Sequence, residues 1–501
     1  MLLTPKTLCA AFLAASCVIG SGCSTHTPYQ PPVKQEFAYF KNDLMNKSIT
    51  LIAQGSIRDP KPEDLAKAAI DGVRKSLGTS YSNFSDKQIK AIIDDQTSAG
   101  HEKIFITAVT AAAESLSPHD VYMSGSSVKE YFIGIKTMRG IGVTLIGDPD
   151  TNGLMIEEIA DVGPEERLQL HSGDVITAVD GTPIAGDMVH GLDMIRGEEG
   201  TAVMLTVIPA SQKTSVQIKV TRGAFQFNPV LSKLIDDVAY IRLRDFQGFA
   251  VAKLIEEAIV NMQKESAGRP IKGYILDLRG NVGGLVSAAT RIADNFIDSN
   301  GGLSFHVQGK KVSYDEKLKP GDILKGAPIV VLINDESASA SEILSGVLQD
   351  YKRATVIGTQ SFGKGSIQTT EYLSYFDKSR NDAVRITSGL YFLPSGASPQ
   401  RYGIIPDILV ENVGPVRNDH EREMANAIPN PAEALSKDRH PSAGCKMNPD
   451  LRDADVPQTM RELRGLPDKA LICAVDYLRH TTTYSSIESK LQVMPARAPA
   501  P

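Results

Sequence analysis

The sequence predicts a multidomain α/β protein, and three changes of pattern along its 501 residues support this fold class. Apolar residues recur at near four-residue spacing between residues 62 and 116, which is typical of amphipathic helices. Between residues 126 and 222 apolar and polar residues alternate and turns intervene, as in a domain built of short strands. From residue 223 to 412 short apolar runs alternate with helical stripes, the pattern of an α/β core.

Composition excludes several classes of protein. Hydrophobic residues make up 42% of the chain and charged residues 22%, which is ordinary for a soluble globular protein and argues against disorder or a membrane bundle. The 53 basic and 59 acidic residues give a net charge of −6, without long blocks of one sign. A nucleic-acid partner would need a basic face, so none is predicted.

The first 23 residues predict an export signal, with Lys6 followed by an apolar stretch over residues 8–19 and small residues that end at Cys23. We therefore expect the mature protein in the periplasm of a Gram-negative bacterium. The Gly-Ser-Gly-Cys segment resembles a lipoprotein cleavage box, in which Cys23 would be lipidated and would anchor the protein to a membrane. Gly20 departs from that box, which usually carries an aliphatic residue there. The alternative is ordinary cleavage beside an incidental cysteine.

Two cysteines remain after the signal, Cys445 and Cys473. An even number in an exported protein predicts a disulfide, and closing this loop would stabilise the fold by roughly 3.5 kcal/mol. The alternative is two separate buried thiols. Two cysteines alone make a poor metal site, and no metal is predicted.

The segments outside the core have simpler patterns. We expect residues 24–125 to form an N-terminal helical domain whose last helix ends at Ser117-Pro118, and which docks a partner or supports the fold. Residues 413–501 form a C-terminal extension, expected to be helical, and they carry the predicted disulfide.

Residues 126–222 resemble a PDZ domain. The segment Gly140-Ile141-Gly142-Val143 matches the Gly-Φ-Gly-Φ loop of that family, and the sequence GDVITAVDG at 173–181 matches a later turn and strand. The resemblance implies that this loop binds a peptide C-terminus. Successive N–H groups of such a loop can bind the terminal carboxylate while the peptide adds a strand to the sheet edge.

A serine and a lysine set 25 positions apart, Ser339 and Lys364, suggest the chemistry, because neither segment contains a histidine. Ser339 follows a short apolar strand at 329–333 and precedes a helical stripe, so it is expected at a strand-to-helix turn. The free N–H groups and the positive end of the helix would face the reacting atom there. A neutral lysine can take the proton of a serine hydroxyl, so these residues predict a Ser-Lys hydrolase.

Five motifs resemble the carboxyl-terminal processing (tail-specific) proteases, serine peptidase family S41, over roughly residues 60–412. In chain order they are SLSPHDVYM, with Ser117 in place of the family's aspartate, YILDLRGNVGG, VLINDESASASEILSGVLQDYKRATVIG, SFGKGSIQ and VRITSGLYFLPSG. The resemblance implies an α/β protease core of the ClpP/crotonase-like kind.

The same resemblance implies the roles of individual residues. Ser339 corresponds to the family's nucleophile, Lys364 to its base and Gln368 to the residue that orients the lysine. In an extended segment Lys364 and Gln368 share a face. Burial must lower the pKa of the lysine from about 10.4 toward neutrality before it can act as a base.

The acyl oxyanion needs two N–H donors, expected from Ala340 and from Gly283 or Gly284. Neither a metal nor another cofactor is required by this chemistry. The family also implies self-association into a homo-oligomer and sometimes an adaptor lipoprotein.

These observations predict an exported endopeptidase that binds proteins with apolar C-termini through its PDZ domain and cleaves at or near those ends. Two alternatives belong to other classes. One is a non-catalytic PDZ scaffold that retains the protease fold. The other is a hydrolase of small esters or amides on the same core.

Overall fold

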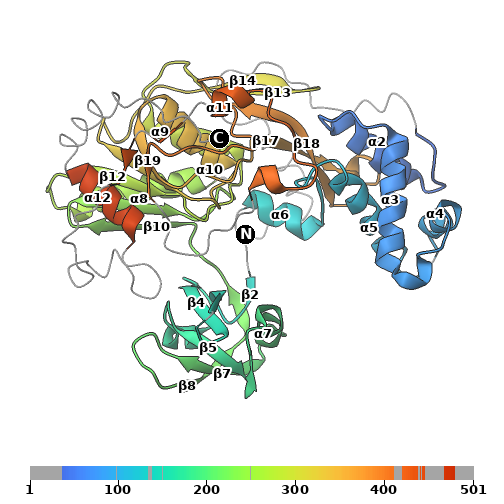
Figure 1. Cartoon of the computed structure of the whole chain (residues 1–501), viewed down its shortest axis with the longest axis horizontal. Helices are drawn as coiled ribbons and strands as arrows, with labels where there is room; N and C mark the ends of the chain where they lie inside the picture. The colour runs from blue at the N-terminus through green and yellow to red at the C-terminus, as the bar shows by residue number, and fades with distance from the viewer. Residues whose placement is uncertain are drawn as a thin grey trace, which may run out of the picture.

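The computed structural model describes residues 37–97, 99–133, 138–148, 150–248, 250–410, 420–437, 440–441, 443–445 and 468–479. The predicted export signal and Cys23 lie outside these ranges. Within the described ranges, no helix combines the length and the apolar character that a bilayer crossing requires. Three units can be followed in Figure 1: a group of N-terminal helices, a small β-rich domain and a large α/β core.

The N-terminal unit is helical, as predicted from its periodicity. It consists of α2 (Asp43–Gly55), α3 (Pro62–Leu77), η1 (Thr79–Tyr81), α4 (Asp86–Asp94) and α5 (His101–Glu114). Helices α3 and α5 approach closely at Gly72, where an added Cβ would lie 2.1 Å from the Cβ of Ala111. The buried cluster of this unit also includes Leu373, Val384 and Ile386 from the core. The helices therefore pack on the core and share its apolar interior.

Residues 138–225 form a separate unit, called the β domain below. Its elements are β2 (Met138–Gly140), β3 (Val143–Asp148), β4 (Gly153–Ile159), η2 (Glu165–Gln169), β5 (Val175–Val179), β6 (Thr182–Pro183), α7 (Met188–Ile195), β7 (Ala202–Ile208), β8 (Val216–Thr221) and β9 (Gly223–Phe225). The main sheet has the order β3-β4-β5-β7-β8, with β6 beside β5. Strand β3 is thus an edge strand within the described part of the chain.

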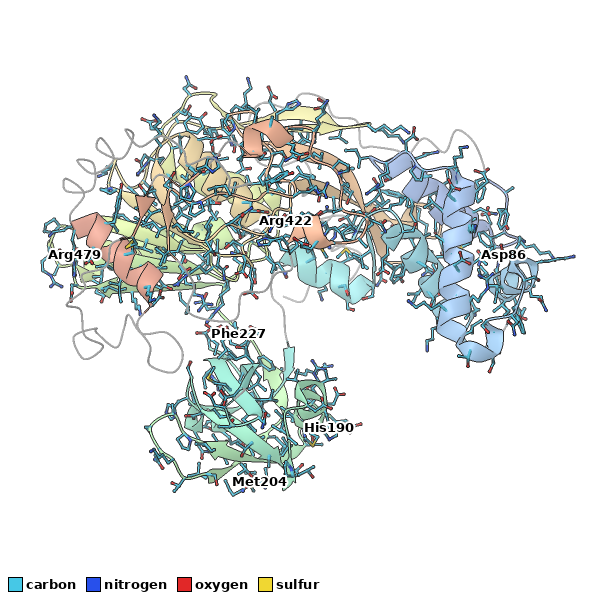
Figure 2. The ribbon with its side chains drawn as sticks, in the orientation of Figure 1. Asp86, His190, Met204, Phe227, Arg422 and Arg479 are labelled. Atoms are coloured by element: carbon cyan, nitrogen blue, oxygen red, sulfur yellow. A yellow bond between two sulfur atoms is a disulfide. The ribbon has the colours of Figure 1, made fainter. Side chains whose placement is uncertain are left out.

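The β domain is joined to the core at a short junction. Strands β2 and β9 pair antiparallel, so the chain enters and leaves the domain side by side. On the core side, Arg244 forms ion pairs with Glu158 and Asp161 of the β domain. Its guanidinium also lies 5.1 Å from the ring centre of Phe227, which Figure 2 labels at this junction.

The α/β core contains two sheets. Its elements in chain order are β10 (Val230–Ile235), β11 (Val238–Leu243), α8 (Val251–Glu265), β12 (Gly273–Asp277), α9 (Val286–Phe296), β13 (Leu303–Gly309), β14 (Ser313–Lys317), β15 (Ile329–Ile333), α10 (Ala340–Asp350), β16 (Ala354–Gly358), β17 (Ser366–Tyr372), η3 (Leu373–Tyr375), β18 (Ala383–Phe392) and β19 (Ile408–Leu409). The larger sheet has the order β10-β11-β12-β15-β16-β19-β20 and is parallel from β11 onward.

Alternate side chains of the larger sheet enter two different apolar layers. On one face Leu276 and Val331 pack with helices α8, α9 and α10. On the other face Ile275 and Val330 pack with the C-terminal helix α12 (Lys469–Arg479). Because both faces are covered, β12 and β15 are buried at every position, which explains why β15 is apolar throughout and β12 is apolar up to Asp277.

The second sheet has the order β1-β18-β13-β14, with β17 also paired to β18. Strand β1 (Val121–Met123) comes from the segment that the sequence analysis placed in the helical domain, yet it pairs with Ala383–Arg385 of β18. Helix α6 (Gly125–Ile133), expected to open the PDZ-like segment, instead packs Tyr131 and Phe132 against the core. The sequence boundary at 125 was therefore wrong, because the apolar contacts of 121–133 face the core.

The boundary at residue 412 also divides a packed unit. The chain after it contributes η4 (Glu421–Glu423), α11 (Glu433–Lys437), β20 (Ala443–Gly444) and α12. Asp468, just before α12, accepts two hydrogen bonds from Arg279, which also pairs with the buried Asp277. The C-terminal residues that the structure describes are part of the core.

Candidate active site

Ser339 lies at the turn between β15 and α10, as its sequence position predicts. Its backbone adopts φ +57° and ψ −114°, a conformation that is costly for a residue with a side chain. The first N–H groups of α10 follow it directly. The turn therefore presents the Ser339 hydroxyl beside the positive end of a helix.

Lys364 and Gln368 approach this serine from the second sheet. The Nζ atom of Lys364 lies 3.5 Å from Oγ of Ser339 and 2.7 Å from Oε1 of Gln368. The first distance is at the outer limit of a hydrogen bond, which is common for catalytic pairs before substrate binds. Gln368 also donates to the hydroxyls of Ser366 and Thr387, so its amide is held in one orientation.

The surroundings of Lys364 favour a neutral amine. Burial, helped by the positive charge of Arg385, lowers the pKa of Lys364 to about 8. The carboxylates of Glu421, Glu342 and Asp120 oppose this shift. A lysine with a pKa near 8 is partly deprotonated at neutral pH, as a general base must be.

The carboxylate of Glu342, in the first turn of α10, joins the segments of Ser339 and Lys364. One oxygen accepts from the N–H of Ser339 and of Lys364, both at 2.8 Å. The other accepts from the N–H of Gly363 at 2.7 Å and from the hydroxyl of Ser361 at 2.6 Å. Burial raises the pKa of Glu342 to about 7, although these four donors oppose the shift.

In the described part of the chain, the N–H groups of Ala340, directly after Ser339, and of Gly284, which lines the same cavity as Ser339, have no hydrogen-bond acceptor. Of the two glycines considered in the sequence analysis, Gly283 is the poorer candidate because its N–H donates to Oδ1 of Asn281 at 2.9 Å. Gly283 is needed instead for its close approach to Ser339. An added Cβ would lie 2.8 Å from the Cβ of Ser339, so only glycine fits there.

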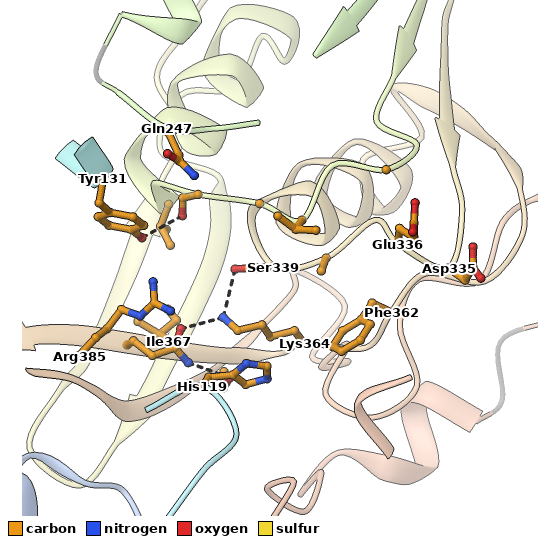
Figure 3. A pocket seen from close by; sticks show the side chains of 18 residues that line it. His119, Tyr131, Gln247, Asp335, Glu336, Ser339, Phe362, Lys364, Ile367 and Arg385 are labelled. Carbon is orange, nitrogen blue, oxygen red and sulfur yellow. Dashed lines mark hydrogen bonds between the residues drawn. The ribbon is translucent and has the colours of Figure 1, made fainter. Parts of the chain in front are cut away.

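Ser339, Lys364 and Gln368 line one open cavity of about 490 Å³, shown in Figure 3. Its remaining walls come from distant parts of the chain. They include His119, Tyr131, Gln247, Gly280, Val282, Gly283, Gly284, Phe362, Ile367 and Arg385. A cavity of this size can hold several residues of an extended peptide beside the hydroxyl.

Comparison with known proteins agrees with this geometry. Residues 237–410 match the model of peptidase family S41. A carboxy-terminal-processing protease of Bartonella bacilliformis is 37% identical over 330 residues, which cover 65% of this chain and 72% of that protein. The chain belongs to peptidase family S41. It is a relative of the carboxyl-terminal-processing serine proteases, including one of Synechocystis that is 34% identical over 55% of this chain and 63% of that protein.

Among solved structures, the chain is similar to the photosystem II D1 C-terminal processing protease. That match has a TM-score of 0.43 and 22% identity, and it covers 74% of this chain and 92% of the other.

Sequence reasoning missed a group of residues behind Gln368. The Thr387 hydroxyl, which accepts from Gln368, lies within hydrogen-bond distance of both Asp120 and Ser117. Burial raises the pKa of Asp120 to about 6, against the hydrogen bonds from Thr387. The motif SLSPHDVYM, at residues 115–123, contained the sequence signal for these residues. In this motif Ser117 stands where the family resemblance implies an aspartate, and the chain's own Asp120 and Ser117 meet at the same threonine.

His119, which lies between Ser117 and Asp120 in the sequence, makes a separate contact. Its Nε2 bonds the buried Glu421, whose other oxygen accepts from Gln400 at 3.0 Å. Burial lowers the pKa of His119. Gln400 in turn accepts from the N–H of Gly365, next to Lys364. The region after residue 412 thus supports the lysine loop.

The predicted peptide loop of the β domain lies at the edge of its sheet. Val143 opens the edge strand β3, and Gly142 has φ +80°, which favours glycine. Gly140 is already paired with Gly223, and Ile141 is 2% exposed, so neither is a free surface residue. Below the loop, the buried Arg167 donates to four backbone carbonyls, those of residues 160, 161, 163 and 164.

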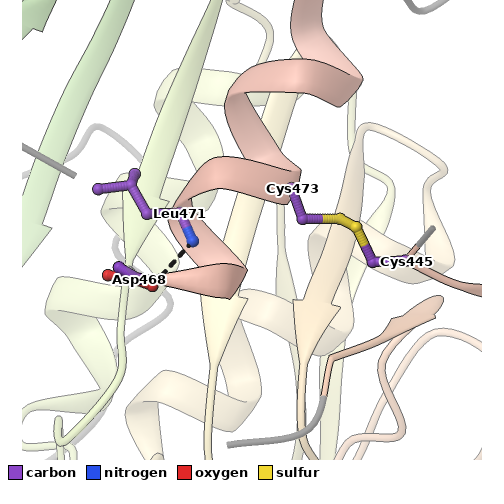
Figure 4. Close-up of a disulfide and its surroundings, with 4 residues drawn as sticks. All are labelled: Cys445, Asp468, Leu471 and Cys473. Carbon is purple, nitrogen blue, oxygen red and sulfur yellow. Dashed lines mark hydrogen bonds between the residues drawn. A yellow bond between two sulfur atoms is a disulfide. The ribbon is translucent and has the colours of Figure 1, made fainter. Parts of the chain in front are cut away.

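Cys445 and Cys473 are joined in a disulfide, shown in Figure 4, with their Cα atoms 6.3 Å apart. Cys473 is in the middle of α12 and Cys445 follows β20. The bond therefore fastens α12 to the edge of the larger sheet. In the same helix, Leu471 donates its N–H to Asp468, the residue that holds Arg279.

We expect the change Glu342→Gln to destabilise the core and reduce activity. In either orientation the amide nitrogen of glutamine would face at least one backbone N–H donor, which leaves buried groups unpaired at a cost of roughly 2–4 kcal/mol. Thermal unfolding should show a midpoint lower by several degrees. The exposed Glu265, at the end of α8, gives a matched control. Equal unfolding midpoints for Glu342→Gln and Glu265→Gln would contradict the role given to Glu342.

Replacing both Cys445 and Cys473 by serine should loosen α12. The disulfide closes a loop with a sequence separation of 28, and its removal should cost about 3.5 kcal/mol in the chain-entropy model. Limited proteolysis should then cut near α12 in the variant and in the reduced wild type, but not in the oxidised wild type. Identical digestion patterns for all three would show that the bond contributes little.

Proposed function

We propose that this chain is an exported serine endopeptidase that cleaves proteins at or near their C-termini through a Ser-Lys acyl-enzyme mechanism. The observation that carries the proposal is the line of Ser339 Oγ, Lys364 Nζ and Gln368 Oε1, with separations of 3.5 and 2.7 Å, inside one cavity. The membership in family S41 supports the same chemistry.

In this mechanism the Ser339 oxygen attacks the carbonyl carbon of the scissile peptide bond, and the neutral Lys364 amine takes the hydroxyl proton. The carbonyl oxygen becomes an oxyanion that accepts hydrogen bonds from the N–H groups of Ala340 and Gly284. Lys364 then returns the proton to the leaving amine, and an acyl-enzyme remains. Water attacks the ester with Lys364 again as the base, which frees Ser339. Gln368 keeps the lysine aimed at the serine.

We assign the β domain the role of a PDZ domain that binds the substrate's C-terminus. Three features support the assignment: a glycine loop, an open edge at β3, and the positive charge of Arg167 beneath the loop. A peptide added beside β3 would gain main-chain hydrogen bonds, and the loop N–H groups would receive its carboxylate. Binding by the tail then raises the local concentration of the rest of the substrate near Ser339.

The proposal also includes export to the periplasm, with lipidation at Cys23 as a means of anchoring. The disulfide between Cys445 and Cys473 supports an oxidising compartment. A homo-oligomer and an adaptor lipoprotein remain predictions from the family resemblance.

Degradation of a loosely folded protein with an apolar C-terminal tail tests the function. Wild type should degrade it, whereas Ser339→Ala and Lys364→Ala should lose at least 10³-fold in kcat/KM. Gln368→Ala should retain more activity, because it removes only the residue that orients the base. Adding two charged residues to the end of the substrate's tail should raise KM for that substrate. The kcat for a short internal peptide should stay unchanged. Equal degradation by wild type and Ser339→Ala would refute the protease assignment.

The pH dependence follows from the lysine. Because Lys364 must be neutral and its pKa is about 8, kcat/KM should rise tenfold per pH unit below 8 and level off above it. At pH 7 only about one-tenth of the enzyme would be in the active form. The measurement is the hydrolysis of a quenched fluorescent peptide between pH 6 and 10. A rate that is independent of pH across 7–9 would exclude Lys364 as the base.

A further inference from the structure

Arg385 has no part in the mechanism above, yet its side chain lies in the same cavity. It is on β18, two residues before Thr387, so both side chains are on the face of the strand toward Gln368. Figure 3 shows its guanidinium pointing into the space between Tyr131 and the Lys364 amine. The guanidinium carbon lies 5.6 Å from the centre of the Tyr131 ring, which holds the side chain over an aromatic face.

The guanidinium has no acidic or hydrogen-bonding partner among the residues that the structure describes. No carboxylate lies within ion-pair distance, and its buried Nε has no acceptor. Two other arginines of the core form ion pairs: Arg279 binds Asp277 and Asp468, and Arg353 binds Asp322. A guanidinium that is partly withdrawn from water and unpaired is unfavourable for the free protein.

The acids nearest this end of the cavity have other partners. Asp120 accepts through Oδ1 from the N–H and the hydroxyl of Thr387, while its buried Oδ2 has no hydrogen-bond partner among the described residues. Glu421 accepts from His119 and Gln400. Asp120 interacts with Arg385 through space only. The five donors of the guanidinium are thus left for something that enters the cavity.

We propose that Arg385 is a specificity-determining residue that binds a carboxylate of the peptide substrate in the active-site cavity. A planar guanidinium receives a carboxylate through two parallel hydrogen bonds, which a lysine cannot reproduce. This inference rests on the proposed peptidase function. The carboxylate has two sources, an Asp or Glu side chain near the scissile bond or the α-carboxylate of a short tail.

Such binding has a consequence for the base. The charge of Arg385 contributes to the low pKa of Lys364, after burial. A bound carboxylate cancels part of that charge. The pKa of Lys364 should therefore be higher with an acidic peptide bound. The rise of the rate with pH should occur at higher pH for an acidic peptide than for its neutral counterpart.

The test uses the full-length enzyme and two sets of quenched fluorescent peptides at pH 9.5, which is above the pKa of about 8 of Lys364 in the wild type. In the first set a single residue around the scissile bond is either Glu or Gln, moved one position at a time. In the second set the peptide ends in a free carboxylate or an amide. Wild type should prefer the acidic member of one set by about 10- to 100-fold in kcat/KM.

Arg385→Gln should abolish that preference, and Arg385→Lys should restore only part of it. Arg291→Gln, which removes an exposed arginine charge on α9 outside the cavity, should behave as wild type. If Arg385→Gln loses a preference for Glu over Gln, the carboxylate that Arg385 binds is a side chain. If it loses a preference for the free acid over the amide, that carboxylate is the α-carboxylate.

Several outcomes would overturn the inference. One is the absence of any acidic preference in wild type, and another is a preference that persists in Arg385→Gln, since the β domain would then be its source. An equal loss for all peptides together with a lower unfolding midpoint would indicate a structural role. The Ser339→Ala variant is measured in parallel. If the proposed function is wrong, the rate of Ser339→Ala will equal that of the wild type. If only the inference about Arg385 is wrong, it will not.

Discussion

One buried carboxylate fixes the relation between the two halves of the active site. Glu342 belongs to the helix that begins at Ser339, and it binds the main-chain N–H groups of Ser339, Gly363 and Lys364. The nucleophile turn and the lysine loop are therefore tied through their backbones, before any side chain of the pair is considered. Burying this acid is costly, and four donors offset much of the cost. The 3.5 Å approach of the amine to the hydroxyl depends on this tie.

Groups around the cavity shift the pKa of Lys364 in opposite directions. Burial and Arg385 favour a neutral Lys364, whereas Glu421, Glu342 and Asp120 favour its protonated form. The result is a pKa near 8, between that of a free lysine and that of a fully buried one. A lysine with this pKa is partly neutral at neutral pH, as the proposed mechanism requires.

Much of the fold and of the site could be predicted from the sequence, because both follow local patterns. The strand at 329–333, the helix after Ser339 and the close approach at Gly283 all leave a signature in a few adjacent residues. What could not be predicted depends on partners far away in the chain. Nothing near residues 121–123 indicates that they pair with β18.

The same limit applies to the supporting residues. Asp120 and Thr387 meet only because β1 and β18 are neighbours, and Glu421 reaches His119 from beyond the segment that resembled the family. In the C-terminal extension the disulfide of Cys473 was predicted, but the contact of Asp468 with Arg279 that attaches the extension to the core was not.

The pairing of β1 with β18 has a consequence for how the enzyme comes into being. The cavity has walls from the first third of the chain, from its middle and from β18, which is among the last strands of the core to be made. A nascent chain that ends before β18 contains the serine and the lysine but not all walls of the cavity. The cavity beside Ser339 is therefore complete only when the chain has folded through β18.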